Sequence, residues 1–205
     1  MPARRPYHHG NLRDAVLDAA RMMVSQEGIA GLSLRALARE VGVSHPAIYN
    51  HFADREALLA ELSTEALLEL GRTQRTALSK ATSALDAMVR LGTAYFRFGV
   101  SDPARLRLAF APEFARSAGY PALRAAADAA EAPAIEAVTR AADEGLLPHR
   151  AIRERTVAQW AMVHGYTVLA IDGRLTEGRL SVAGAGFAPL VRALSRAVRL
   201  MYERE

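Results

Sequence analysis

"GLSLRALAREVGVSHPAIYNHF", residues 31–52, contains two short helical patterns separated by a glycine. Apolar residues recur at helical spacing in the first pattern, at Leu34, Leu37, Ala38 and Val41. Ser33 precedes them as an N-cap and Gly42 follows them as a helix stop. Ser44 is the N-cap candidate of the second pattern, and Pro46 fits its first turn, where a missing N–H costs nothing.

The second helix is about seven residues long and turns Ile48 and Phe52 towards the interior. It begins about three residues after Gly42, which is the spacing of a helix-turn-helix unit. In such a unit the second helix enters the major groove of DNA, its N-terminal residues face base edges, and flanking groups hold phosphates. The stretch therefore predicts contact with double-stranded DNA.

The polar side chains of the stretch suit this task. Those that can donate to a phosphate oxygen are Ser33, Ser44, Tyr49, His51 and, opening the next helix, Arg55. Those that can meet base edges are Arg35, which can reach guanine, His45 and Asn50, with Ala47 placed for a thymine methyl group.

Other interpretations of these residues are weaker. His45 and His51 are six residues apart, on opposed faces of a helix, and no carboxylate or cysteine joins them at ligand spacing, so we expect no metal site. No base and orienting acid accompany Ser44, so we expect no catalytic centre. Tyr49 can alternatively serve only in packing. The basic arm with His8 and His9 can follow DNA, neutralise phosphates or be disordered.

Residues 31–62, "GLSLRALAREVGVSHPAIYNHFADREALLAEL", resemble the N-terminal DNA-binding domain of TetR-family transcriptional regulators. The similarity extends from Tyr7 to about Leu70 and includes the Tyr-x-His-Phe motif at residues 49–52. It implies the phosphate and base contacts assigned above. Arg55 stands where the family most often has lysine, and Asn50 stands where many members have a larger aromatic residue.

Helical patterns continue on both sides of this stretch. One helix is predicted from about Asn11 to Glu27. Asp54 caps a long helix whose inward residues are Leu58, Leu62, Ala66 and Leu70. The acidic face of this helix, formed by Glu61, Glu65 and Glu69, is expected to be solvated.

The chain remains helical after residue 80, with no convincing strand. Pro112, Pro121 and Pro133 are expected to divide its middle into short helices. The prediction is an all-α fold in which an N-terminal three-helix helix-turn-helix DNA-binding domain is joined by a long helix to a larger helical ligand-binding and dimerisation domain. The arm and DNA-binding domain occupy residues 1–54, the connecting helix about 55–79, and the effector-binding and dimerisation domain 80–205.

The C-terminal region contains enough aromatic and thioether side chains to line an apolar cavity, although each can equally be plain core. The candidate effector-pocket residues are Met88, Tyr95, Phe96, Phe110, Phe114, Trp160 and His164. "WAMVHG", residues 160–165, is similar to the Trp…His-Gly signature of a WHG-type C-terminal domain. For His164 we favour a core position satisfied by a carbonyl over a ligand contact, and Gly165 permits close helix approach.

One helix-turn-helix contacts too few base pairs to find an operator, so the expected form is a homodimer on a short inverted repeat. The family resemblance implies a four-helix interface from residues of about 148–171 and 187–202. The predicted interface residues are Val163, Leu169, Leu190, Val191, Leu194, Val198 and Met201.

The composition excludes several classes of functional site. The 205-residue chain has a formal net charge of +4 and no cysteine, which excludes disulfides, thiolate zinc sites and cysteine nucleophiles. It shows no apolar run long enough to span a membrane and no secretory signal, so we expect a cytoplasmic protein without membrane contact. We predict a ligand-responsive regulator of transcription, most often a repressor in this family, with no cofactor and an unidentified small apolar or amphipathic effector. A small helical enzyme and a helical adaptor that does not bind DNA are the alternatives.

Overall fold

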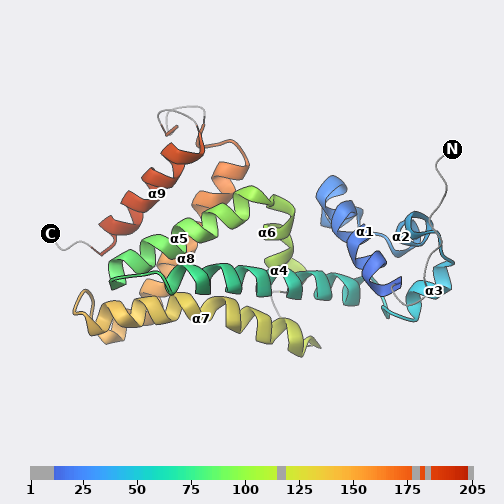
Figure 1. The fold of residues 1–205 in the computed structure, drawn as a ribbon, viewed down its shortest axis with the longest axis horizontal. Helices are drawn as coiled ribbons and strands as arrows, with labels where there is room; N and C mark the ends of the chain where they lie inside the picture. Colours follow the sequence, from blue (N-terminus) through green and yellow to red (C-terminus); the bar gives the residue numbers. More distant parts are fainter. Residues whose placement is uncertain (1–11, 115–118, 177–180, 183–185, 203–205) are drawn as a thin grey trace.

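The computed structural model describes residues 12–114, 119–176, 181–182 and 186–202, and these residues form helices without any strand. The predicted helix start Asn11 and the arm with His8 and His9 lie outside the described residues. The elements, shown in Figure 1, are α1 (Leu12–Glu27), η2 (Ile29–Gly31), α2 (Leu34–Val41), α3 (His45–Tyr49), α4 (Arg55–Leu78), α5 (Ala84–Ser101), α6 (Pro103–Ala109), η3 (Pro112–Phe114), α7 (Pro121–Asp143), η5 (His149–Ala151), α8 (Ile152–Ile171) and α9 (Phe187–Leu200). The all-α prediction is confirmed.

Helices α1, α2 and α3 form one end of the molecule, and α4 leads from them into the larger helical part (Figure 1). The predicted caps define α2: Ser33 Oγ accepts from Ala36 N, and Gly42 ends the helix at φ 77°, in the left-handed region that favours glycine. Asp54 caps α4 by accepting from Ala57 N at 2.7 Å.

Helix α3 differs from its prediction in two details. It spans five residues, shorter than expected. Ser44 occupies the N-cap position, but its side chain makes no capping bond, so capping does not explain this serine. Ile48 and Phe52 are buried as predicted and anchor the helix.

The acidic face of α4 is not simply solvated. Glu61 forms an ion pair with Arg13 of α1, and Glu65 accepts from Nη2 of Arg21 of α1 at 2.8 Å. Glu65 and Glu69, whose side chains are 39% and 43% exposed, match the expected solvated face, and Glu69 pairs with Arg72 on its own helix. The prediction was wrong for Glu61, whose side chain is only 25% exposed, because periodicity within one helix does not show which second helix packs beside it.

Helix α7 continues through Pro133, contrary to the prediction that this proline ends a helix. An interior proline removes one backbone hydrogen bond and costs about 3 kcal/mol. Packing against α4 offsets this cost. Gly71 lies so close to α7 that an added Cβ would stand 3.3 Å from Ala129 O, and Gln74 Nε2 donates to Ala130 O at 3.2 Å.

The apolar stripes of α8 and α9 pack inside their own chain. Four of the seven residues predicted for the dimer interface are buried here, namely Val163, Leu190, Leu194 and Val198. They contribute to the core and cannot be reached by a second subunit unless the fold opens. Of the other three, Leu169 is 46% exposed, and Val191 and Met201 are half-buried.

No helix within the described ranges is both long enough and apolar enough to cross a lipid bilayer.

Gly99 of α5 lies at a close helix contact in the core. A Cβ at this position would lie 2.5 Å from Thr167 Cγ2 and 2.9 Å from Leu106 Cδ2. We expect Gly99→Ala to lower the free energy of unfolding by about 1–3 kcal/mol, because the added methyl group overpacks the core. Chemical denaturation measures this change.

Thr167→Ser removes the clashing methyl group and keeps the hydroxyl that donates to Val163 O. The Gly99→Ala/Thr167→Ser double variant should therefore recover part of the lost stability. If the effects of the two substitutions on the free energy of unfolding simply add, the methyl–methyl clash is not the cause of the lost stability.

Candidate nucleic-acid interface and ligand cavity

The connection between α2 and α3 is tight. Gly42 N and Val43 N both donate to Ala38 O, at 3.0 and 2.9 Å, which closes the last turn of α2 and turns the chain into α3. With Ile48 and Phe52 buried beneath it and Ala47 half-buried, α3 has a fixed inner face, and its other side chains are exposed. This is the geometry of a helix-turn-helix unit.

Most of the predicted DNA-contacting residues lie on this outer surface. The exposed ones are Arg35, Ser44, His45, Tyr49, Asn50 and His51, and the half-buried ones are Ser33, Ala47 and Arg55. The rings of His45 and Tyr49 meet edge to face with centroids 5.0 Å apart, while the Tyr49 side chain remains 48% exposed. Tyr49 thus packs on a neighbour while about half of it stays exposed.

Arg39 is a basic residue of this surface that the sequence analysis missed. It lies one turn after Arg35, is exposed, and has no carboxylate partner among the described residues, as is also true of Arg35. The four-residue spacing of the two arginines was the signal that could have identified it.

Arg55 has a structural task in addition to its charge. Its Nε donates to Leu32 O at 2.9 Å and its Nη2 donates to Ile29 O at 2.6 Å. These bonds tie the start of α4 to the segment that precedes α2. A phosphate contact by the remaining donors stays a prediction.

A cavity of about 1000 Å³ lies within the larger helical part, bounded by α4, α5, α7 and α8 and by the end of α6. Five of the seven predicted pocket residues line it, namely Tyr95, Phe110, Phe114, Trp160 and His164. Met88 and Phe96 do not line the cavity. They are fully buried, and the Phe96 ring packs on Tyr166 and Phe187 instead.

His164 is not held by a carbonyl. Its Nδ1 lies 2.6 Å from the hydroxyl of Tyr95, and its ring lies 5.9 Å from that of Trp160, one helical turn earlier. Burial lowers the pKa of His164, so the ring is neutral near pH 7. The favoured interpretation from the sequence was wrong about the partner, because a tyrosine 69 positions away supplies it.

Three buried polar residues of the cavity, Ser63, Gln74 and Gln159, were also missed. On α4, Ser63 and Gln74 continue the inward stripe of Leu67 and Leu70. Polar residues inside an apolar stripe were the available signal. No group of three histidine, aspartate or glutamate side chains in the described ranges is arranged to hold a metal ion.

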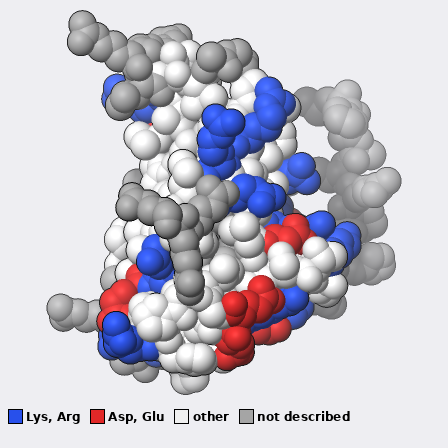
Figure 2. Space-filling view, turned by 90° about the vertical axis from the view of Figure 1, so that its left-hand side faces the viewer, with Lys and Arg blue, Asp and Glu red and all other residues white. Residues whose placement is uncertain are grey.

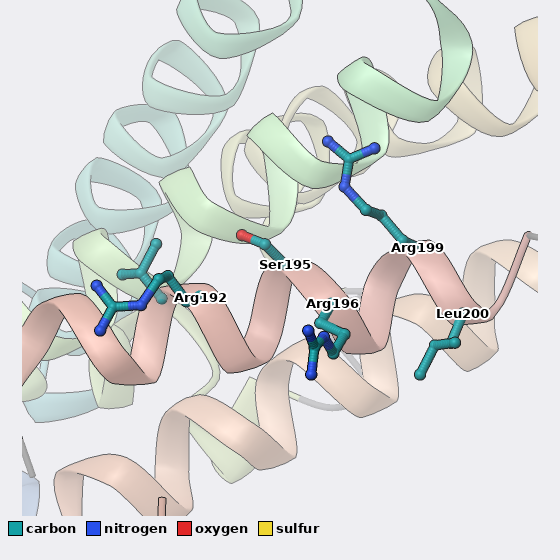
Figure 3. Close-up of a pocket in the computed structure, with 6 residues that line it drawn as sticks. Arg192, Ser195, Arg196, Arg199 and Leu200 are labelled. Atoms are coloured by element: carbon teal, nitrogen blue, oxygen red, sulfur yellow. The ribbon is translucent and has the colours of Figure 1, made fainter. Parts of the chain in front are cut away.

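The outer face of α9 carries a shallow groove with a basic character. Its lining residues are Val191, Arg192, Ser195, Arg196, Arg199 and Leu200 (Figure 3). Figure 2 shows the face at the left of Figure 1, where α9 ends. Basic side chains gather in the upper half of this face, at the height of α9.

Comparison with known proteins matches both parts of the chain. Residues 16–62 match the family described as "Bacterial regulatory proteins, tetR family", and residues 88–199 match "Tetracyclin repressor-like, C-terminal domain". The HTH-type transcriptional regulator YobS of Bacillus subtilis, described as uncharacterized, is 32% identical over 94 residues, which are 46% of this chain and 49% of that protein. The chain spans about half the length of this curated relative and less of others.

Solved structures extend the similarity to nearly the whole chain. A protein of unknown function from Rhodococcus sp. RHA1 superimposes with a TM-score of 0.80 and 32% sequence identity, covering 98% of this chain and 100% of that one. The TetR family transcriptional regulator PfmR from Thermus thermophilus superimposes with a TM-score of 0.66 and 19% identity, covering 92% and 99%. The latter likeness shows the fold alone.

The two carbonyl contacts of Arg55 predict that a lysine cannot replace it without loss. We expect Arg55→Lys to lower the free energy of unfolding by about 1.5–3 kcal/mol, because an ammonium group cannot reproduce two bonds from one planar fork. Thermal or denaturant unfolding measures the change. The control is Arg72→Lys on the same helix, because Arg72 makes only one exposed ion pair, with Glu69. This substitution should leave the free energy of unfolding nearly unchanged. Equal stability of the two variants would show that the Arg55 contacts add nothing.

Proposed function

The chain belongs to the TetR family of bacterial regulatory proteins and is therefore a DNA-binding transcriptional regulator; from this premise we propose that it is a repressor. In this proposal it binds a palindromic operator as a homodimer and is released by a small apolar or amphipathic effector. The relatives of this chain are transcriptional regulators. Three expectations stay predictions: that the protein is not an enzyme, that its C-terminal domain is of the WHG type, and that it is cytoplasmic.

The observation that carries the DNA-binding role is the polar outer surface of α2 and α3 over a buried apolar anchor. Ile48 and Phe52 fix α3, while Arg35, His45 and Asn50 remain exposed at its side. Arginine can bind guanine through two hydrogen bonds, and asparagine can bind adenine in the same way. Phosphate contacts by Tyr49, His51 and the opening of α2 would hold the helix in register.

The outer face of α8 supports the homodimer. On the side opposite Val163, this helix presents Ala158, Ala161, Gly165 and Leu169, of which all but Gly165 are exposed. A Cβ at Gly165 would meet nothing within 4 Å, so no helix in the described part of the same chain packs closely on this glycine. In the proposed dimer, a helix of the second subunit would pack there. These residues replace the buried ones as the proposed interface.

The outer faces of α8 and α9 carry opposite charges. Glu154 and Asp172 lie at the two ends of the outer face of α8, and Arg192, Arg196 and Arg199 lie on that of α9. None of the five has an ion-pair partner in the described part of the chain. A two-fold axis would place α9 of one subunit against α8 of the other, so acids and arginines could pair across it.

The effector part of the proposal rests on the cavity and on a contact that links it to α4. Phe114 lines the cavity, and its ring packs edge to face on Tyr120 with centroids 5.4 Å apart. Burial, followed by the neighbouring Glu56 carboxylate, raises the pKa of Tyr120, which places its hydroxyl near the first turn of α4. A ligand that moved Phe114 would act on the helix next to α3.

Release requires that the effector prefer the form that does not bind DNA. A roughly 100-fold loss of operator affinity corresponds to about 2.7 kcal/mol of coupling, which lies within the usual allosteric range of about 1–3 kcal/mol.

DNA recognition is tested by first selecting the operator from random duplexes. We expect the selected sequence to be an inverted repeat with half-sites about one helical turn apart. We expect Arg35→Ala to cost about 1–3 kcal/mol of binding free energy and to weaken the sequence preference at one base position. Fluorescence anisotropy on the selected duplex measures the cost. Arg72→Ala, which removes an exposed arginine far from α3, is the control. An Arg35→Ala protein that binds like the control would favour the adaptor alternative.

The dimer is tested at Leu169. We expect Leu169→Glu to shift the protein towards monomer in sedimentation experiments, because two carboxylates would be brought near the two-fold axis of an apolar interface. Met22→Glu, at a 62% exposed residue of α1, is the matched control and should leave the mass unchanged. A Leu169→Glu variant with the control's mass would place the interface elsewhere.

A further inference from the structure

The interior of the cavity is free of charged side chains. Its charged lining residues are all exposed and lie at the rim, namely Arg124, Asp128, Glu131, Arg150 and Arg153. The wall between them is apolar and includes Leu67 and Leu70 of α4. Moving an isolated ion from water into such surroundings is strongly unfavourable unless an opposite charge meets it. The cavity therefore favours a molecule without a formal charge on its buried part.

Ser63 provides an unused hydrogen-bonding group in this interior. Its side chain is 1% exposed, and its Oγ has no hydrogen-bond partner among the described residues. The neighbouring Thr64 bonds its hydroxyl to Ala60 O at 2.7 Å, which is the local bond that a helical hydroxyl usually makes and that Ser63 does not make. A buried hydroxyl without a partner is unfavourable, and a ligand oxygen would relieve this cost.

His164 provides a second group, whose donor atom follows from its neighbours. Burial raises the pKa of Tyr95 far above neutrality, so its hydroxyl is protonated. The one hydrogen-bond partner of this buried hydroxyl among the described residues is Nδ1 of His164, at 2.6 Å, so the hydroxyl donates its proton there. The neutral imidazole then carries its hydrogen on Nε2, which has no partner among the described residues.

The two buried amides of the cavity are already engaged within the chain. Gln74 donates to Ala130 O, and Gln159 donates to Met88 O while accepting from the Tyr202 hydroxyl at 2.7 Å. Ser63 Oγ, which can donate and accept, and the Nε2–H of His164, which can only donate, have no hydrogen-bond partner at all among the described residues. Both groups suit a carbonyl or hydroxyl oxygen.

We propose that the cavity binds an uncharged, mainly apolar molecule that carries a carbonyl or hydroxyl oxygen, with Ser63 and His164 as its hydrogen-bonding partners and Leu67 and Leu70 against its apolar body. This inference deepens the effector role and rests on the proposed function. It names the chemical class of the effector: a neutral alcohol or ketone in preference to a carboxylate or an amine of the same skeleton.

The test uses the full chain and three probes with one skeleton: decanol, decanoate and decylammonium. Trp160 is the only tryptophan and lines the cavity, so its fluorescence reports occupancy. We expect decanol to bind at least tenfold more tightly than either ion at neutral pH. Tighter or equal binding of decanoate or decylammonium, or no binding of decanol, would overturn the proposal.

Ser63→Ala tests the assigned oxygen contact. It should weaken decanol binding roughly three- to tenfold, the effect of losing one hydrogen bond, and should not lower the melting temperature of the ligand-free protein. Ser79→Ala, at an exposed serine at the end of the same helix, is the control and should bind like the unmodified protein. A Ser63→Ala protein that binds decanol unchanged, or is less stable without ligand, contradicts the assignment.

Operator binding separates this inference from the proposed function. If decanol occupies the cavity as described but never weakens the operator complex, the ligand class stands and the effector role fails. If the complex is weakened by decanoate but not by decanol, the effector role stands and the ligand class is wrong.

Discussion

The rigid course of α4 is the constraint on which the rest of the structure depends. Its first residue ties it to the segment before α2, because the Arg55 guanidinium donates to the carbonyls of Ile29 and Leu32. Further along, Glu61 and Glu65 pair with arginines of α1. Its opposite face closes the cavity, and Gly71 lets α7 pack directly on its backbone. One helix therefore contacts both the DNA-binding end and the cavity.

The proposed effector role would act through contacts near α4. Tyr120 packs on Phe114 of the cavity wall and lies near Glu56 in the first turn of α4, only a few residues from α3. The polar groups inside the cavity are few. Gln74 and Gln159 are bonded within the chain, and in our proposal Ser63 is left for a ligand oxygen.

The helix-turn-helix unit and the exposure of its side chains were largely predictable because they depend on local rules. Caps, a left-handed glycine and two inward residues determine α2 and α3, and side chains on the remaining positions must then face outward. Arg39 was overlooked although its spacing from Arg35 was visible. The additional task of Arg55 was not visible, because its partners lie 23 and 26 positions away along the chain.

The sequence by itself determined the helices, their limits at caps and glycines, the family resemblance and the aromatic character of the cavity, since all of these follow from neighbouring residues. Only the tertiary structure decided which face of a helix meets which partner. Periodicity located an apolar stripe on α9 but could not show that Leu194 and Val198 face their own core. It could not show that packing on α4 sustains α7 through Pro133, or that Tyr95 holds His164. These outcomes depend on contacts between residues far apart in the chain, whose energies no local pattern contains.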